Sequence, residues 1–224
     1  MVAEGSTLNL HVNSVDHDPS REGQGGAPLL FRTNQGDIRA AYHEAPNAHA
    51  GVVWVWGADG GLEGPAEGIY ARLADQLTAQ GLTSIRVDYR HPRALMDSVG
   101  DTLVGVRYLK GKGLDRLALV GHSFGGAVVI TAGVLSQEVK AVVALSSQTS
   151  GTQAVGALSP RALLLVHGEA DTRLPPQISR TIYLWAKEPK ELVLYPGAGH
   201  GLRQCRAELD ALLTRWLTEK LQAA

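Results

Sequence analysis

Several residue types that mark other classes of protein are scarce or absent in this chain. Cys205 is the only cysteine among the 224 residues, so no internal disulfide is possible, and a reducing compartment is expected. The formal net charge is −1, so the chain has no basic excess to attract nucleic acid or an anionic membrane surface. No apolar run approaches the ~20 residues of a membrane-spanning helix. These absences argue against disulfide-rich, membrane-spanning and nucleic-acid-binding proteins.

The first residues of the sequence do not predict a secretory signal peptide. Residues 1–6 have neither the positive charge nor the apolar run of a secretory signal peptide. We therefore expect a cytoplasmic protein with no membrane and no nucleic-acid partner. What is present is a hydrophobic fraction of 44% and a charged fraction of 19%, which are typical of a globular domain with a large core. No feature of the sequence indicates an oligomeric state.

The N-terminal stretch differs in composition from the rest of the chain. Residues 1–27 are polar and rich in glycine, and we assign them to an N-terminal arm. Within this arm, the alternation over residues 8–12 favours an edge strand, and the remainder is expected to be loop. Residues 28–224 are assigned to a single α/β domain, because domains of about 200 to 250 residues are ordinary for such folds.

Strand and helix patterns alternate along this domain. Residues 29–33 and 38–43 predict an antiparallel hairpin, and the apolar run over 51–56 predicts a central strand buried on both faces. Further strands are predicted over residues 82–89, 117–121, 139–145, 162–167 and 191–195. Helices are predicted over residues 65–80, 93–110, 125–136, 177–187 and 202–221. This order predicts a doubly wound, mostly parallel sheet with an antiparallel hairpin at its start and helices on both faces. A functional site is then expected beyond the carboxyl ends of the strands.

One strand-to-helix turn carries the most specific pattern in the chain. The apolar strand over 117–120 ends in G-H-S-F-G over residues 121–125, and an apolar helical run follows. Such a turn holds its serine in strained backbone geometry, with the hydroxyl lifted clear of the sheet edge. Gly121 and Gly125 suit this geometry because a Cβ at either position would crowd the opposing backbone. Ser123 is therefore the candidate nucleophile, and a structural turn serine is the alternative.

Two more loops with chemically informative residues follow predicted strands. Residues 167–171 read H-G-E-A-D, and residues 197–201 read G-A-G-H-G. A serine hydroxyl is a poor nucleophile until a base takes its proton, and His200 is the candidate base. Asp171 is the candidate acid that orients His200, because the strand after the nucleophile helix ends without a carboxylate. Glu169 is the rival acid and is expected to face solvent or hold the loop. The simpler alternatives are a turn cap at Asp171 and a surface histidine at His200.

The other histidines near these motifs are predicted to be structural. His122 precedes Ser123 but should point away from it, because adjacent residues in a sharp turn diverge. His167 ends a predicted strand and is expected to be packed rather than catalytic. Cys205 has no histidine and acid arranged around it, so no nucleophilic or redox role is expected there.

The three motifs occur in the order serine, acid, histidine, and together they carry a family resemblance. Over residues 28–220 the chain resembles a small member of the α/β-hydrolase superfamily, in the cap-less esterase and dienelactone-hydrolase-like branch with a serine nucleophile. The resemblance implies the α/β-hydrolase fold without a cap domain, and a catalytic triad formed by the three candidates named above. It also implies an oxyanion hole made by the backbone N–H groups of Phe124 and Ala58.

The chain departs from its relatives around the expected pocket. Related chains often have His-Gly where this chain has Trp56 and Gly57, which changes the wall of the oxyanion pocket. Many relatives carry a helical cap where this chain has only residues 147–160, so we expect an open, shallow site. Trp56, Leu62 and Leu174 are candidate walls of the substrate pocket, and core packing is the alternative for each.

The predicted function is a serine carboxylesterase that cleaves small to medium acyl esters through an acyl-enzyme on Ser123. His200 would act as general base and acid, and Asp171 would orient it. No metal or organic cofactor is expected, and the partner is a small-molecule ester. Two alternatives stay open: another acyl-transfer enzyme on the same triad, such as a thioesterase, peptidase or lactonase, and a non-catalytic binding protein with the same fold.

Overall fold

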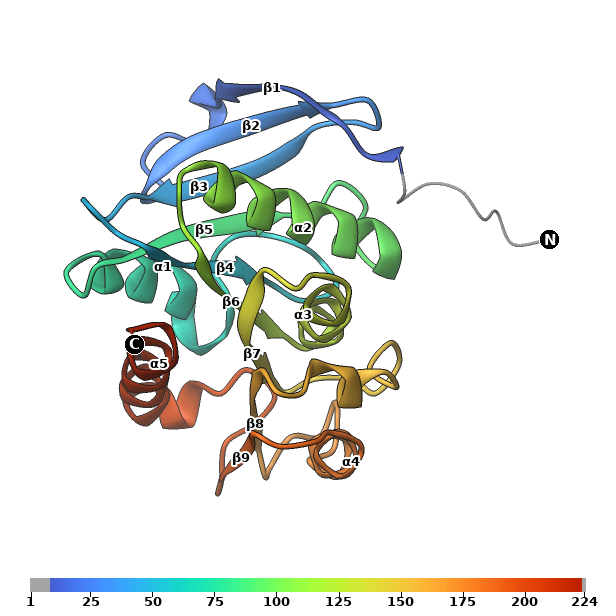
Figure 1. Ribbon diagram of the computed structural model, residues 1–224. Helices are drawn as coiled ribbons and strands as arrows, with labels where there is room; N and C mark the ends of the chain where they lie inside the picture. The colour runs from blue at the N-terminus through green and yellow to red at the C-terminus, as the bar shows by residue number, and fades with distance from the viewer. Residues whose placement is uncertain (1–8, 223–224) are drawn as a thin grey trace.

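The central sheet of the computed structural model, which describes residues 9–222, orders its nine strands β1-β2-β3-β5-β4-β6-β7-β8-β9 (Figure 1). The strands are β1 Val12–His17, β2 Ala27–Thr33, β3 Ile38–His43, β4 Ala50–Val55, β5 Leu82–Asp88, β6 Arg116–His122, β7 Val139–Leu145, β8 Ala162–Gly168 and β9 Lys190–Tyr195. The pairs β1–β2, β2–β3 and β3–β5 are antiparallel. The remaining neighbours in the sheet, β5–β4, β4–β6, β6–β7, β7–β8 and β8–β9, are parallel. The predicted mostly parallel sheet with an antiparallel start is confirmed.

Helices cover both faces of this sheet. Helices α1 Pro65–Thr78 and α5 Arg206–Gln222 lie on one face, and α2 Leu95–Gly111, α3 Phe124–Leu135 and α4 Gln177–Trp185 lie on the other (Figure 1). Strand β4 contributes to the core on each face: Val53 and Val55 pack on the side of α2 and α3, whereas Val52 and Trp54 pack on the side of α1 and α5. Because successive side chains point to opposite faces, a strand buried on both sides must be apolar throughout.

The first strand lies later in the chain than the sequence pattern predicts. Residue 8 is outside the described part of the chain, and β1 runs from Val12 to His17, where a loop was expected. That expectation is wrong because β1 is an edge strand exposed on both faces, so its residues need no apolar alternation. Its antiparallel ladder with β2 holds it, with a register shift between Val12 and Ser14.

Two helices begin later than their apolar patterns predict. Helix α2 starts at Leu95 rather than at residue 93, and α5 starts at Arg206 rather than at residue 202. Arg93 and Leu202 both have positive φ angles, 73° and 54°, which a right-handed helix does not accommodate. A short 3-10 turn over Arg203–Cys205 connects Leu202 to α5.

The carboxyl edge of the parallel sheet is where the loops with chemically informative residues meet. Ser123 follows β6, Asp171 follows β8 and His200 follows β9. The connection between β7 and β8 contains a single 3-10 turn, Val155–Leu158. Within residues 9–222, therefore, no helical cap domain is inserted above this edge.

Candidate active site

Ser123 occupies a strained turn between β6 and α3. Its φ and ψ angles are 59° and −120°, a conformation that few residues other than glycine adopt. A Cβ atom on Gly121 would overlap the carbonyl oxygen of Gly125, and a Cβ atom on Gly125 would overlap the carbonyl oxygen of Trp56. The expectation that these two glycines allow a close backbone approach is confirmed.

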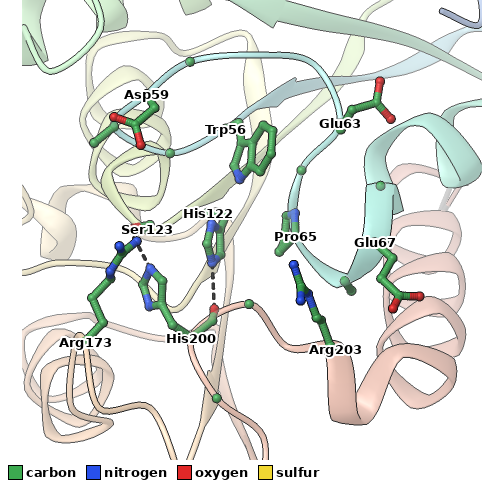
Figure 2. Close-up of a pocket in the computed structure, with 18 of the residues that line it drawn as sticks. Trp56, Asp59, Glu63, Pro65, Glu67, His122, Ser123, Arg173, His200 and Arg203 are labelled. Atoms are coloured by element: carbon green, nitrogen blue, oxygen red, sulfur yellow. Dashed lines mark hydrogen bonds between the residues drawn. The ribbon is translucent and has the colours of Figure 1, made fainter.

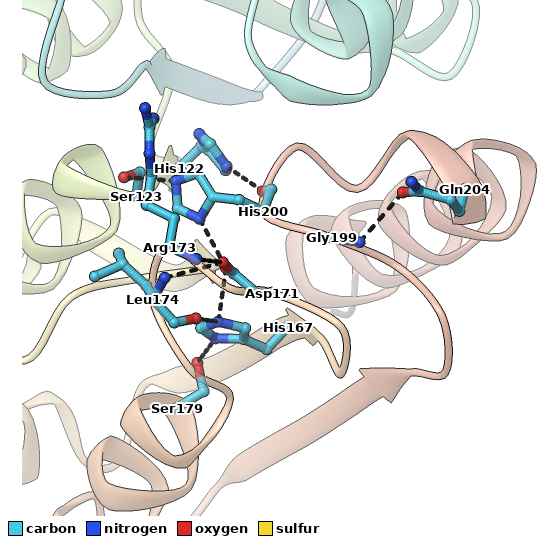
Figure 3. A network of polar contacts seen from close by, with 10 residues as sticks. All are labelled: His122, Ser123, His167, Asp171, Arg173, Leu174, Ser179, Gly199, His200 and Gln204. Atoms are coloured by element: carbon cyan, nitrogen blue, oxygen red, sulfur yellow. Dashed lines mark hydrogen bonds and ion pairs between the residues drawn. The ribbon is translucent and has the colours of Figure 1, made fainter.

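The structure brings Ser123, His200 and Asp171 together in one hydrogen-bonded chain (Figure 3). His200 Nε2 lies 3.0 Å from Ser123 Oγ, and His200 Nδ1 lies 2.7 Å from Asp171 Oδ2. An ionised carboxylate only accepts hydrogen bonds, so Nδ1 carries the proton and Nε2 accepts from the serine hydroxyl. In this arrangement the ring is ready to take the hydroxyl proton.

The carboxylate of Asp171 is fully buried and fully bonded. Its Oδ1 atom accepts hydrogen bonds from the backbone N–H groups of Arg173, at 2.8 Å, and Leu174, at 2.9 Å. Burial alone would raise the pKa of Asp171, but these two N–H groups and the His200 ring together lower it below its usual value. Asp171 therefore caps its turn and also bonds His200. Glu169 is exposed and lies 3.6 Å from Arg180, so the expectation that it faces solvent is confirmed.

His122 has a closer relation to the site than its sequence position suggests. Its ring packs against the His200 ring with a centroid separation of 4.8 Å, and its Nε2 atom donates to the His200 carbonyl oxygen over 2.8 Å (Figure 2). Burial lowers the pKa of His122 to about 4, so the ring is neutral near pH 7. The interpretation of His122 as a structural residue missed this contact, which its place directly before Ser123 could have indicated.

His167 is buried, as predicted, but it also contacts the carboxylate. Its Nε2 atom lies 3.1 Å from Asp171 Oδ2 (Figure 3). His167 and Asp171 are only four residues apart at the exit of one strand, and this spacing could have indicated their contact. The prediction that His167 is packed is confirmed, and its contact with Asp171 is an addition that the structure makes.

A cavity of about 640 Å³ lies beside Ser123 and His200 (Figure 2). One wall is the connection from β4 to α1, which includes Trp56, and the other is the segment after His200. Leu62 does not line this cavity, because its side chain is buried in the interior at 3% exposure. Leu174 does not line it either; its backbone is bonded to Asp171 and His167. Of the three predicted wall residues, only Trp56 faces the cavity.

Charged side chains that the sequence analysis did not assign to the site also line this cavity. They are Asp59, Glu63, Glu67, Arg173 and Arg203 (Figure 2). The first turn of α1 is irregular, because residues 66–68 all have positive φ angles. Glu67 lies within this left-handed segment, so the periodicity of a regular helix does not give the direction of its side chain.

The two predicted oxyanion donors belong to two segments that adjoin Ser123, the start of α3 and the loop after β4. Phe124 is the first residue of α3, and the N–H groups of a first helical turn have no partner within the helix. Ala58 lines the cavity, and the neighbouring Gly57 is so close that a Cβ atom there would lie 3.8 Å from Ser123 Cβ. The phenyl ring of Phe124 packs edge-on against Tyr89. A role for both N–H groups in binding an oxyanion stays a prediction.

The described part of the chain offers neither a cluster of metal ligands nor a reactive thiol. Over residues 9–222, no group of three or more His, Cys, Asp or Glu side chains is placed to hold a metal ion. In the same range, no helix combines the length and apolar character needed to cross a membrane. Cys205 is buried, and burial raises the pKa of its thiol to about 11, which keeps it protonated.

Comparisons with known proteins give the family and the fold of this chain. A sequence model of the dienelactone hydrolase family matches residues 64–213. The chain belongs to the dienelactone hydrolase family. The uncharacterized protein YfhR of Escherichia coli (strain K12) is 31% identical over 129 residues, a match that covers 47% of this chain and 45% of YfhR. The match thus spans just under half the length of this curated relative.

Solved structures show the same fold. The α/β hydrolase GrgF from Penicillium sp. sh18 superposes with a TM-score of 0.73 at 16% identity, covering 88% of this chain and 99% of that one. The dienelactone hydrolase from Anabaena variabilis gives a TM-score of 0.68 at 18% identity, covering 87% of this chain and 99% of that one. The dienelactone hydrolase family member described here therefore has the α/β-hydrolase fold, and its family and fold support a hydrolase.

Proposed function

We propose that this protein is a serine esterase that cleaves small to medium acyl esters through an acyl-enzyme on Ser123. The observation that carries the proposal is the hydrogen-bonded chain from Ser123 through His200 to Asp171, at a strained turn beside a cavity. Family membership supports the same class of reaction. A binding protein would have no use for an ionised, buried acid behind a histidine that contacts an accessible serine.

The reaction begins with attack of Ser123 Oγ on the ester carbonyl carbon. His200 Nε2 takes the hydroxyl proton as the new C–O bond forms, and the carbonyl oxygen gains the negative charge. The N–H groups of Phe124 and Ala58 would donate to this oxyanion. The amino end of α3 adds a favourable dipole at the same place.

The tetrahedral intermediate then collapses to the acyl-enzyme, which is hydrolysed in a second half-reaction. His200 returns its proton to the leaving alcohol as the C–O bond to the alcohol breaks, which leaves the acyl group on Ser123. A water molecule next attacks the acyl carbon while His200 takes its proton, and the return of that proton to Ser123 releases the carboxylic acid. Throughout, Asp171 holds the ring and stabilises its protonated form.

The shape of the cavity supports a substrate of modest size. A volume of about 640 Å³ lies within the usual range for small-molecule sites. The short connection between β7 and β8 leaves the cavity without a helical cap in the described residues. The reaction steps above require no metal and no organic cofactor.

A lactone is the second substrate class that we propose. Membership of the dienelactone hydrolase family favours it, and a lactone is a cyclic ester opened by the same steps. The two classes differ in the leaving group, which stays attached to the acyl part in a lactone. A panel of linear esters and lactones compared by kcat/KM ranks them.

The decisive experiment combines a substrate series with an active-site label. Hydrolysis of p-nitrophenyl esters of increasing chain length is measured for the wild type and for Ser123→Ala. We expect short acyl chains to be cleaved fastest by the wild type and no cleavage above background by the variant. A fluorophosphonate should label the wild type at Ser123 only. Absence of both hydrolysis and labelling would refute the proposal and favour a binding protein.

A further inference from the structure

The polar network around Asp171 extends beyond His200 to a second histidine and a second serine (Figure 3). At the end of β8, His167 Nε2 lies 3.1 Å from Asp171 Oδ2 and 2.8 Å from the carbonyl oxygen of Leu174. On the other side of the ring, Nδ1 lies 2.7 Å from Ser179 Oγ. The side chains of His167 and Asp171 are both 0% exposed, so these contacts take the place of solvent.

The partners of His167 determine which ring nitrogen carries the proton. A carbonyl oxygen can only accept, so the contact with Leu174 requires a proton on Nε2. The same N–H is shared with the carboxylate of Asp171. The other nitrogen, Nδ1, then accepts from the Ser179 hydroxyl. Burial lowers the pKa of His167 and outweighs the contacts with Leu174 and Asp171, which raise it. The ring is therefore neutral in this tautomer.

Asp171 thus receives hydrogen bonds from four neutral donors. Two backbone N–H groups bond Oδ1, and the rings of His167 and His200 bond Oδ2. Neutral donors keep the carboxylate ionised and aligned without cancelling its charge. That negative charge stays available to stabilise the protonated ring of His200 during the reaction. A cation in the place of His167 would compete for it.

We propose that His167, held in its Nε2–H tautomer by the carbonyl oxygen of Leu174 and bonded at Nδ1 by Ser179, is a positioning residue that acts through Asp171 on His200. The inference rests on the proposed function, because it assigns His167 a part in the same reaction. Within residues 9–222, two other titratable or charged groups face the pair of Asp171 and His200. The His122 ring packs against His200 from the end of β6, and Arg173 lines the cavity beside it.

Replacement of the ring tests the proposal kinetically. In His167→Leu, Oδ2 of Asp171 keeps His200 as its only donor, so the carboxylate is less restrained and more basic. We expect kcat to fall about tenfold, the effect of one hydrogen bond to a charged group. A more basic carboxylate favours protonated His200, so the acidic limb of the kcat/KM profile should move to higher pH. His167→Gln keeps an N–H donor and should restore most of kcat and the wild-type limb.

A matched control separates positioning from general destabilisation. His43 is a second buried histidine, and its partners, Asp75 and Arg86, lie outside this network. His43→Leu should lower the melting temperature but leave kcat and the pH profile unchanged. A wild-type acidic limb in His167→Leu, or identical kinetics in the Leu and Gln variants, would overturn the proposal. Ser123→Ala in the same assay tests the proposed function separately.

A spectroscopic measurement on the wild type needs neither activity nor a folded His167 variant. NMR of histidine rings labelled with a nitrogen isotope should show His167 with a protonated Nε2 and an unprotonated Nδ1 at pH 7. Ser179→Ala should shift the Nδ1 resonance, because it removes the hydroxyl that Nδ1 accepts from. A protonated Nδ1, or a resonance that ignores Ser179→Ala, would overturn the assignment and the proposal with it.

Discussion

The Nε2 atom of His122 donates a hydrogen bond to the carbonyl oxygen of His200 over 2.8 Å. This bond joins the last residue of β6, directly before Ser123, to the loop after β9, which carries the histidine that contacts Ser123. The bond requires only one protonated nitrogen on the His122 ring, and burial keeps the ring neutral. The contact therefore aligns two distant loops without placing a second positive charge beside His200.

The first prediction concerns stability at low pH. Burial lowers the pKa of His122 from 6.5 to about 4, so the unfolded chain binds this proton at a higher pH than the folded chain. The stability from this group is present above pH 6.5 and is lost as the pH falls toward 4. A pKa shift of this size corresponds to a loss of about 3 kcal/mol in the free energy of unfolding. Urea unfolding at a series of pH values should show the loss.

A substituted chain provides the control for this pH dependence. His122→Gln should give a shallower decline between the same two pH values, because the titrating ring is gone. Part of the slope should persist, since burial also lowers the pKa of His43 and of His167. His49→Gln, at an exposed histidine, is the control and should keep the wild-type slope. Equal slopes for wild type and His122→Gln would contradict the prediction.

The second prediction distinguishes the two acids of the H-G-E-A-D loop. Asp171→Asn preserves the size of the side chain but presents an amide to His200, which favours the wrong ring tautomer. We expect kcat to fall by about 10⁴-fold, the typical cost of this change in a serine triad. Glu169→Gln, on the exposed neighbour, should leave kcat within about twofold of the wild type. Equal losses in the two variants would argue against Asp171 as the orienting acid.

The third prediction concerns the turn that holds Ser123. In Gly125→Ala the new Cβ atom would overlap the Trp56 carbonyl oxygen, and because that atom is backbone the clash cannot be relieved by a side-chain rotation. We expect a loss of at least about 3 kcal/mol in unfolding free energy, at the upper end for overpacking. Gly111→Ala is the matched control, since no atom lies within 4 Å of its added Cβ. That change should stabilise the last turn of α2 by about 0.5 to 1 kcal/mol.

The fourth prediction tests the oxyanion donor on the loop after β4. Ala58→Pro removes the backbone N–H, and the loss of one such donor costs about 3 kcal/mol of barrier, or 10² to 10³-fold in kcat. KM should change much less, because the donor acts on the charge that develops in the transition state. Ala58→Ser retains the N–H and should keep most of the turnover. Wild-type kcat in the proline variant would exclude this N–H as a donor.

The sequence by itself was sufficient to predict most of the helices and strands of this protein. Apolar runs and helical periodicity predicted the parallel strands and the helices, because burial on one or two faces imposes a repeat on the residues themselves. The glycines around Ser123 predicted its turn, since only a missing Cβ permits that backbone approach. Asp171 and His200 were found because parallel strands end at one edge of a sheet, so loops that are far apart along the chain meet there.

The neighbours of each side chain were decided only by the tertiary structure. Strand β1 is exposed on both faces, so no burial pattern marked it, and pairing with β2 alone defines its position. The contacts of His122 with His200 and of His167 with Asp171 depend on ring orientations that no local repeat encodes. The cavity wall likewise depends on the left-handed turn over residues 66–68. Periodicity records whether a residue is buried, whereas packing between distant segments determines what it touches.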